Sequence, residues 1–394
     1  MTEKYLVQPN LEFIDEVAGL GGDTLKKCFQ CATCSVACPI SPDTRPFPRK
    51  EMISASWGLK DKLISDGDIW LCHQCGDCSE LCPRGAKPGD VLAALRSIAI
   101  TEYAQPKAIA KAVNDPRKLP FLIGIPAIWF AILAFITVNY GETMTKIFHT
   151  FGIEWSHSHG AAHHVIAAAN FFSTWFVDLT FVPLSIFVVV IFGLGLKRFV
   201  KAIHENALAE GKTDKQELNW KEFFQAMARV IPVILRHEKF NQCETNNDRS
   251  TAHMMVLYSF IGLAIVTGIF FFVLYGFHIP GPYSQLNPVK WLANISGIAL
   301  IIGVSLMIKN RLEKKDQVST YKDWYILGTI LILGLTGLLT EMSRLAGFAG
   351  FSYFIYYLHL IAIFNLFAFL PFSKMAHLVY RLFAMTYAEY GNRT

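Results

Sequence analysis

Charged side chains are scarce in this sequence. Asp, Glu, Lys and Arg make up only 17% of its 394 residues, whereas 53% are hydrophobic. No basic stripe interleaved with aromatic residues accompanies the net charge of +5, so the composition does not indicate a protein that binds nucleic acid. The first hundred or so residues are ordinary polar sequence, and long apolar runs begin only after Leu119. This uneven distribution indicates a soluble head followed by a membrane domain.

The N-terminus also lacks the marks of an exported protein. Residues 1–10 contain neither an apolar signal-peptide core nor a twin-arginine pattern. We therefore expect the head to stay on the cytoplasmic side of the membrane. In that reducing compartment, clustered cysteines indicate metal ligands rather than disulfides.

Eight of the nine cysteines form two motifs with the spacing C-x2-C-x2-C-x3-C, each followed by proline, and the second copy starts 44 residues after the first (28 to 72). This is the bacterial ferredoxin pattern for [4Fe–4S] clusters, in which the fourth cysteine ligates the other cluster. Zinc sites usually space their cysteines as separated pairs instead. We assign one cluster to Cys28, Cys31, Cys34 and Cys82, and the other to Cys72, Cys75, Cys78 and Cys38. Cys243 stands alone, and we expect it to be a structural or incidental residue rather than a ligand.

Six apolar stretches are long enough to span a bilayer, which takes about 20 residues. They cover residues 119–140, 175–196, 252–277, 291–308, 324–345 and 351–372. Ten Lys or Arg lie within 197–251 and five within 309–322, whereas the alternate loops carry only Lys146 and Lys290. By the positive-inside rule, this bias predicts a multi-pass protein of the cytoplasmic membrane with both termini and the head in the cytoplasm.

The expected fold class is all-α. The long spacer between the cysteine motifs favours an α-helical, ferredoxin-like head with two clusters over residues 1–106, with helices over 11–27, 50–65 and 89–103. A polar linker over 107–118 joins it to a membrane domain over 119–394, which contains a cytoplasmic loop over 197–251.

Histidines in or near the apolar stretches indicate cofactor ligands, because an ionisable side chain is costly in a bilayer. His253 starts the third stretch, His359 lies in the sixth, and His377 follows it after Pro371. A continuous helix would separate His359 from His377 by about 27 Å, so we expect two b-type haems near opposite faces. His253 and His377 are the predicted pair on the cytoplasmic side. His359 is the predicted outer ligand, and its partner remains open among His163, His164 and His278.

Glu341 and Arg344 are the candidates for a quinone site. They lie three residues apart near the outer end of the fifth stretch and so share a helix face. A carboxylate there could accept protons from a quinol while the arginine holds it ionised. The alternative is a structural ion pair at the interface.

These motifs resemble known redox proteins. The head resembles the C-type subunit of heterodisulfide reductase. The membrane part resembles the E-type subunit of the same enzyme and the gamma subunit of respiratory nitrate reductase, through His359, the Pro371-Phe372-Ser373 sequence and His377. The fusion of both modules resembles the C-type subunit of the quinone-interacting membrane-bound oxidoreductase complexes of sulfate reducers. The resemblance implies cytoplasmic flavin-containing partners similar to the A-type subunit of heterodisulfide reductase, and electron flow between menaquinol and adenylylsulfate reductase.

We therefore expect an oxidoreductase subunit that is incomplete on its own. It would relay electrons between menaquinol in the membrane quinone pool, through haem b and two [4Fe–4S] clusters, and cytoplasmic partners in sulfate reduction. One alternative is a membrane module of the heterodisulfide reductase type that uses another acceptor. Another is a membrane redox sensor or scaffold without turnover.

Overall fold

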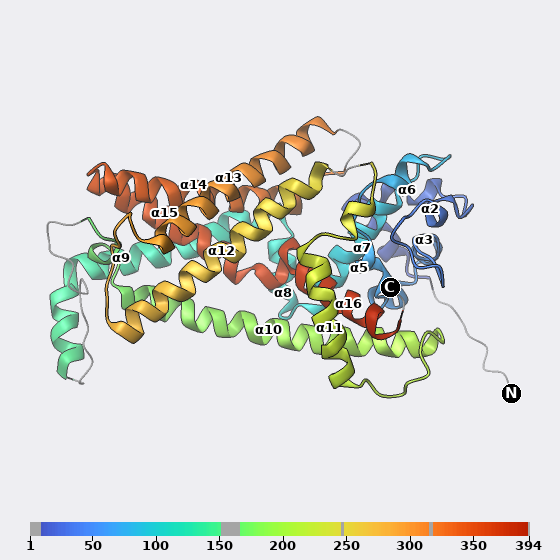
Figure 1. Ribbon diagram of the computed structural model, residues 1–394, viewed down its shortest axis with the longest axis horizontal. Helices are drawn as coiled ribbons and strands as arrows, with labels where there is room; N and C mark the ends of the chain where they lie inside the picture. The colour runs from blue at the N-terminus through green and yellow to red at the C-terminus, as the bar shows by residue number, and fades with distance from the viewer. Residues whose placement is uncertain (1–8, 151–165, 246–247, 315–317, 393–394) are drawn as a thin grey trace.

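The computed structural model describes residues 9–150, 166–245, 248–314 and 318–392, and within these ranges the chain forms helices and no strand. Figure 1 shows short helices gathered at one end of an elongated molecule and long helices filling the remainder. We call residues 9–106 the head. The prediction of an all-α chain is confirmed for the described residues.

The head is an assembly of short helices. They are α1 (Leu11–Val17), α2 (Thr33–Val36), α3 (Arg49–Ser56), α4 (Lys60–Ile64), α5 (Asp68–Leu71), α6 (Asp77–Glu80) and α7 (Pro88–Tyr103). The side chain of Asn10 caps α1 by accepting a hydrogen bond from the Phe13 amide. Two predicted helices are not continuous, because left-handed glycines interrupt them: Gly21 (φ 102°) within 11–27 and Gly58 (φ 68°) within 50–65. The predicted helix over 89–103 is confirmed as α7.

The segment predicted to be a linker is folded. Residues Lys107–Val113 form α8, followed by a 3-10 turn over Pro116–Lys118. Ala110 and Val113 of α8 are buried. The head therefore passes into the long helices through a packed connection rather than a flexible tether.

Six helices of the described chain are long and apolar enough to cross a membrane, as predicted. They are α9 (Leu119–Thr150), α10 (Thr174–Ala209), α12 (Asp248–Phe277), α13 (Pro288–Glu313), α14 (Tyr321–Leu345) and α15 (Ala349–Ala368). Large apolar side chains such as Val189 (69% exposed) and Phe272 (62% exposed) point away from the protein. Exposed apolar surface on this scale fits a lipid environment and not water. The sixth span is shorter than predicted: α15 ends at Ala368, and Pro371, which has no amide hydrogen, lies in a 3-10 turn.

Two further helices lie beside the head. They are α11 (Trp220–Leu235) and α16 (His377–Tyr390), and they pack on each other. Phe223 contacts Phe383, with ring centroids 5.9 Å apart, and Arg229 forms an ion pair with Glu389 at 2.7 Å. His359 and His377 are consequently on different helices, α15 and α16, so the continuous-helix estimate of their separation does not apply.

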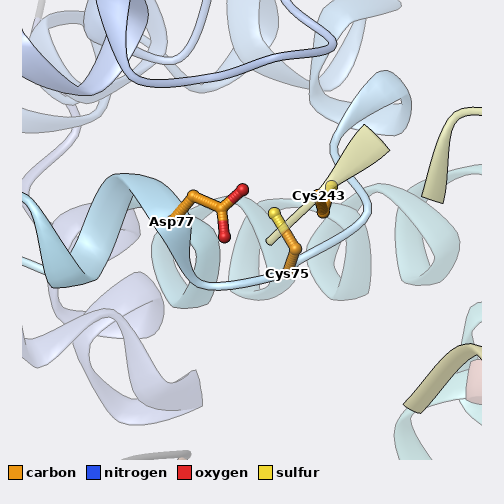
Figure 2. A group of neighbouring side chains, drawn as sticks. All are labelled: Cys75, Asp77 and Cys243. Carbon is orange, nitrogen blue, oxygen red and sulfur yellow. The ribbon is translucent and has the colours of Figure 1, made fainter. Parts of the chain in front are cut away.

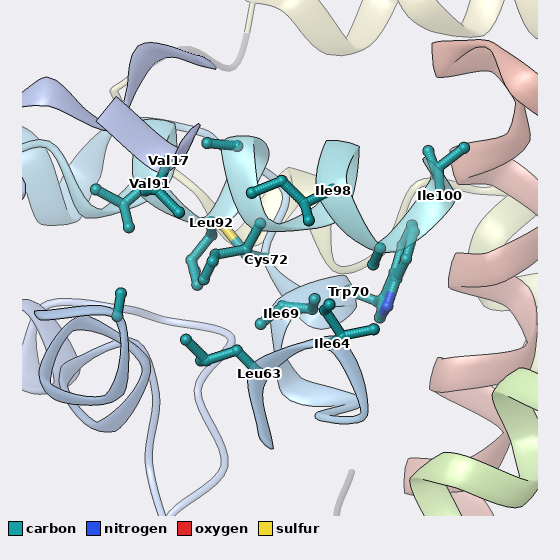
Figure 3. Packing of buried hydrophobic residues seen from close by; sticks show 14 of the residues in the cluster. Val17, Leu63, Ile64, Ile69, Trp70, Cys72, Val91, Leu92, Ile98 and Ile100 are labelled. Atoms are coloured by element: carbon teal, nitrogen blue, oxygen red, sulfur yellow. The ribbon is translucent and has the colours of Figure 1, made fainter. Parts of the chain in front are cut away.

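A single buried core joins the head to the long helices. Trp70 of α5 stacks on Tyr380 of α16 at 5.3 Å, and both contact Phe199 of α10 edge-on. Figure 3 shows Trp70 and the neighbouring Ile100 facing these helices from the head. Burial of large aromatic side chains stabilises such a contact strongly. The end of the head that carries Trp70 is therefore fixed against the membrane domain.

Candidate functional site

The two cysteine motifs have the same backbone conformation. Gln30 and Ala32 in the first copy adopt φ values of 62° and 71°, and the matching Gln74 and Gly76 in the second adopt 55° and 105°. Left-handed conformations are uncommon outside glycine, so their recurrence at matching positions indicates a loop built for a purpose. Each loop leads into a one-turn helix, and these helices, α2 and α6, contact each other. The sequence repeat is thus a structural repeat as well.

The cysteines gather in two groups that cross between the motifs. Burial and the thiols of Cys28, Cys31 and Cys82 raise the pKa of Cys34 to about 11. Burial, with Cys72 and Cys75 close by, raises the pKa of Cys38 to about 12. These influences of Cys82 on Cys34, and of Cys72 and Cys75 on Cys38, agree with the predicted exchange of the fourth cysteines, which stays a prediction. Thiols crowded in this way favour a bound cation, because metal ligation removes their protons and neutralises the thiolates.

The two groups differ in exposure. Cys72, Cys75 and Cys78 of the second copy are all buried, whereas Cys31 of the first copy is exposed. Three arginines also hold the backbone before and within the second motif. Arg96 donates to the Ile69 carbonyl (2.7 Å), Arg249 donates to the Gln74 carbonyl (3.0 Å), and Arg381 donates to the carbonyls of Trp70 and Cys72. Arg249 and Arg381 come from α12 and α16, so the membrane domain itself fixes the second loop.

A cavity of about 260 Å³ lies where the second motif meets α12, α14 and α16, and four histidines line it: His73, His237, His253 and His377. The rings of His253 and His377, the predicted pair, have centroids 6.3 Å apart. Ile326, Leu327 and Ile330 of α14 give the wall an apolar part. The charged lining comprises six basic residues (Arg96, Arg249, Arg311, Lys322, Lys374 and Arg381) and two acidic ones (Asp90 and Asp323). The cavity therefore suits a largely apolar ligand that carries negative groups.

Hydrogen bonds orient the two paired histidines. His377 donates from Nδ1 to the Lys374 carbonyl (2.6 Å), and His253 Nδ1 bonds with His237 Nε2 (2.9 Å). These bonds use one nitrogen of each ring and leave Nε2 as the potential ligand atom, an arrangement typical of metal-binding histidines. Burial, Arg381 and His253 hold the pKa of His377 well below its ordinary value, so its ring is neutral and able to coordinate a metal.

The predicted outer histidine lies apart from this pair. His359 bonds through Nδ1 to Thr336 Oγ1 (2.9 Å), and its ring lies against Gly337 of α14. Of its predicted partners, His163 and His164 lie outside the described residues. His278 is described, and it is an exposed residue just beyond the end of α12 with no ring contact to His359 among the described side chains.

Glu341 and Arg344 lie together, as predicted, and other residues join them. Arg344 forms an ion pair with Glu341 at 2.8 Å, Lys290 forms another at 3.0 Å, and Gln285 donates to the same carboxylate. All three charged side chains are at least four-fifths buried. Neither Glu341 nor Arg344 lines the cavity of the histidine pair.

The sequence did not single out His237 and His73, and it predicted Cys243 only as a structural or incidental residue. His237 and His73 line the cavity, and Cys243 lies with Cys75 and Asp77, where the three ligand atoms are within 4.8 Å of one another (Figure 2). The hydrogen bond with Cys243 lowers the pKa of Cys75. No spacing rule connects positions so far apart in the chain. The only available signal was the proximity of His73 to Cys72 in the sequence.

Comparisons with known proteins fall on two parts of the chain. Residues 24–86 match the family described as a 4Fe-4S dicluster domain, and residues 159–394 match the family described as citrate utilization protein B. No solved structure matches.

Several curated relatives match the head alone. The C-type subunit of the H(2):CoB-CoM heterodisulfide,ferredoxin reductase of Methanothermobacter marburgensis is 42% identical over 86 residues, covering 22% of this chain and 46% of the relative. The second C-type iron-sulfur subunit of the CoB–CoM heterodisulfide reductase of Methanocaldococcus jannaschii is 41% identical over 102 residues, covering 24% and 54%. The chain thus spans about half the length of the curated relatives it matches.

These comparisons agree with the two repeated cysteine loops of the head, which suit iron–sulfur clusters. They also indicate an iron–sulfur component of an oxidoreductase. The likeness to the nitrate reductase gamma subunit stays a prediction. Since the second family model covers more than half of the 394 residues, the chain belongs to the citrate utilization protein B family.

Proposed function

We propose that the chain is a membrane subunit that carries electrons between menaquinol and soluble flavin-containing partners, through haem b and two [4Fe–4S] clusters. The observation that carries this proposal is the pairing of His253 and His377 in a cavity that the second cysteine motif also lines, through His73 and Gln74. In this arrangement, a redox group held by the histidines would be a neighbour of the second cluster.

His253 and His377 would hold the iron of haem b. With a metal–nitrogen bond of about 2 Å and a ring centre about 1 Å behind the nitrogen, two imidazoles on one iron stand about 6 Å apart. The observed separation is 6.3 Å. Haem b, when bound, supplies an iron that can gain and lose one electron. Ile326, Leu327 and Ile330 of α14 would contact the apolar part of the haem, while the excess of basic side chains would neutralise its carboxylates.

The first motif suits exchange with a soluble partner. Phe29 (67%) and Val36 (87%) in the first motif, and Leu81 (59%) next to Cys82, are exposed apolar side chains. Figure 1 shows α2, which carries Val36, at the end of the molecule away from the long helices. An apolar patch beside an exposed cysteine ligand favours docking of another protein. The proposed route therefore runs from the histidine pair to the second cluster, then to the first cluster and on to the partner. For this partner we propose a flavoprotein similar to the A-type subunit of heterodisulfide reductase, with adenylylsulfate reductase as the final partner.

Glu341 and Arg344 remain our candidates for contact with menaquinol, now with Lys290 as a third member. Glu341 lies four residues beyond Gly337, about 6 Å farther along α14. Because the His359 ring lies against Gly337, Glu341 and His359 are at a similar level along α14. This neighbourhood supports the proposal that His359 holds a second haem near the quinone. The proposed orientation puts the head and both termini in the cytoplasm.

The test is the cofactor content of the full-length chain isolated anaerobically from membranes. We expect haem b bands together with iron and sulfide for two clusters. His253→Ala and His377→Ala should each lose the haem that this pair would hold and keep the clusters. His204→Ala is the matched control, because His204 is also buried but bonds to Tyr387 and the Gln216 carbonyl. A protein with intact clusters and no haem would contradict the proposal.

A further inference from the structure

Cys243 lies against one ligand of the second cluster motif. It is buried, and its Sγ lies within 4.8 Å of both the Cys75 sulfur and the Asp77 carboxylate. Figure 2 shows the three side chains meeting from two separate segments, with Cys75 and Asp77 on the head and Cys243 on the chain that leads into α12. The eight motif cysteines already supply four thiolates to each cluster, so Cys243 is a ninth thiol beside a complete set.

The two residues that follow Cys243 hold it close to the second cysteine motif. The amides of Glu244 and Thr245 donate to the Asp77 carboxylate at 3.2 Å and 2.8 Å. Asp77 is itself buried, with 6% of its surface exposed. A buried carboxylate that accepts two amide hydrogens makes strong, charge-assisted bonds. The residues after Cys243 are therefore clamped onto the second loop.

The first motif offers a counterpart. Cys31 occupies the position that Cys75 holds in the second copy, and its sulfur bonds with the hydroxyl of Thr33 at 3.3 Å. In the second copy the residue matching Thr33 is Asp77, an ionised carboxylate that cannot donate a hydrogen bond. The second copy thus has no hydroxyl at this position, and the Sγ of Cys243, which also lies 3.9 Å from the Lys239 carbonyl, is within 4.8 Å of the Cys75 sulfur.

We propose that Cys243 is a positioning residue of the second cluster, whose thiol donates a hydrogen bond to the cluster-bound sulfur of Cys75 in the role that Thr33 has on Cys31. Hydrogen bonds to cluster sulfurs stabilise the more negative, reduced state and so raise the reduction potential. Because Cys243 lies ten residues before His253 in the sequence, the same segment that tunes the cluster leads into the helix that bears the proposed haem ligand. The inference rests on the proposed iron–sulfur content of the chain, but it does not depend on haem or quinone.

The experiment compares Cys243→Ala, Cys243→Ser and Thr33→Ala in the full-length chain. Iron is quantified first, and each cluster is then titrated potentiometrically by EPR, with the two signals assigned from Cys28→Ser and Cys72→Ser. We expect all three test variants to keep the iron of the wild type. Cys243→Ala should lower the potential of the second cluster alone, Cys243→Ser should return it toward the wild-type value, and Thr33→Ala should lower the potential of the first cluster alone.

Three results would overturn the inference. One is an unchanged second-cluster potential in Cys243→Ala. Another is an equal shift of both clusters. The third is loss of about half of the iron in Cys243→Ala, which would make Cys243 a ligand. Absence of clusters from the wild-type protein would instead refute the proposed function at its base, and iron analysis separates that failure from the other three.

Discussion

The two copies of the cysteine motif share a backbone but have different surroundings. The first copy places Phe29 at the surface, beneath the guanidinium of Arg84 at 4.0 Å, whereas the second places His73 at the matching position, in the wall of the cavity. Thr33 bonds locally to Cys31, whereas the matching Asp77 binds two amides from a segment 167 and 168 residues away. A duplicated motif has thus been adapted at single positions, with one copy facing outward and the other facing the membrane domain.

This contrast predicts that the loss of a ligand from the first motif and the loss of the matching ligand from the second motif have different effects. Cys28→Ser and Cys72→Ser should each remove one cluster, about half of the iron. Only Cys72→Ser should cut the remaining cluster off from the membrane domain, because the surviving first cluster lies away from the cavity. The measurement is iron content combined with reoxidation of the dithionite-reduced chain by a menaquinone analogue. Equal reoxidation rates in the two variants would contradict the proposed order of the clusters.

The junction beside the second copy should dominate stability. Trp70 is fully buried between Phe199 and Tyr380, so Trp70→Ala should destabilise the chain by about 3–5 kcal/mol. Trp57, which lies between the two copies in the sequence, is 61% exposed, and Trp57→Ala should change stability by no more than about 0.5 kcal/mol. The stability of both variants is measured by denaturation in detergent. Unfolding is monitored by the circular dichroism of the helices, because this signal does not depend on the replaced tryptophan. Similar losses in the two variants would show that the head is not anchored through Trp70.

Loss of the hydrogen bonds that join Asp77 to the amides of Glu244 and Thr245 should destabilise the chain less than Trp70→Ala does. Asp77→Asn should weaken two charge-assisted hydrogen bonds by about 1–3 kcal/mol and speed amide hydrogen exchange at Glu244 and Thr245. Thr33→Ala is the matched variant in the first copy and should leave this exchange unchanged.

The clamp also has a defined pH range. Burial alone would raise the pKa of Asp77, but the hydrogen bonds from Thr245 and Glu244 lower it below its ordinary value. A lowered pKa in the folded state means that the stabilisation is complete above about pH 4 and is lost only as the pH falls through the lowered value. An increase in hydrogen exchange at the Glu244 and Thr245 amides between pH 7 and pH 5 would contradict this account.

The smallest effect on the chain itself should come from the exposed patch of the first copy. Phe29→Asp should leave iron content unchanged and stability within about 0.5 kcal/mol, because the side chain is exposed. It should nevertheless weaken the association with a soluble partner in pull-downs from membranes. Leu11→Asp is the control, since Leu11 is 71% exposed on a different helix, α1. Equal recovery of the partner with both variants would show that the patch is not its docking site.

Local patterns in the sequence predicted the parts of this structure that depend on neighbouring residues. The cysteine spacing and the apolar runs gave the motifs and the six long helices, because each is specified within about 20 residues. The pairing of His253 with His377 was also predicted, from their positions at the same end of two spans. Tertiary contacts decided the rest. Cys243 and His237 reach the site only because the segment before α12 folds back over the head, and Lys290 joins Glu341 only when α13 packs beside α14.

The central claim is that the histidine pair is the entry to the second cluster from the membrane. The most direct test is the reoxidation of the dithionite-reduced chain by a menaquinone analogue in the wild type and in His253→Ala, with both clusters followed by EPR. We predict rapid reoxidation of both clusters in the wild type, and clusters that are intact but stay reduced in His253→Ala. Reoxidation of the His253→Ala clusters at the wild-type rate would contradict the proposed route.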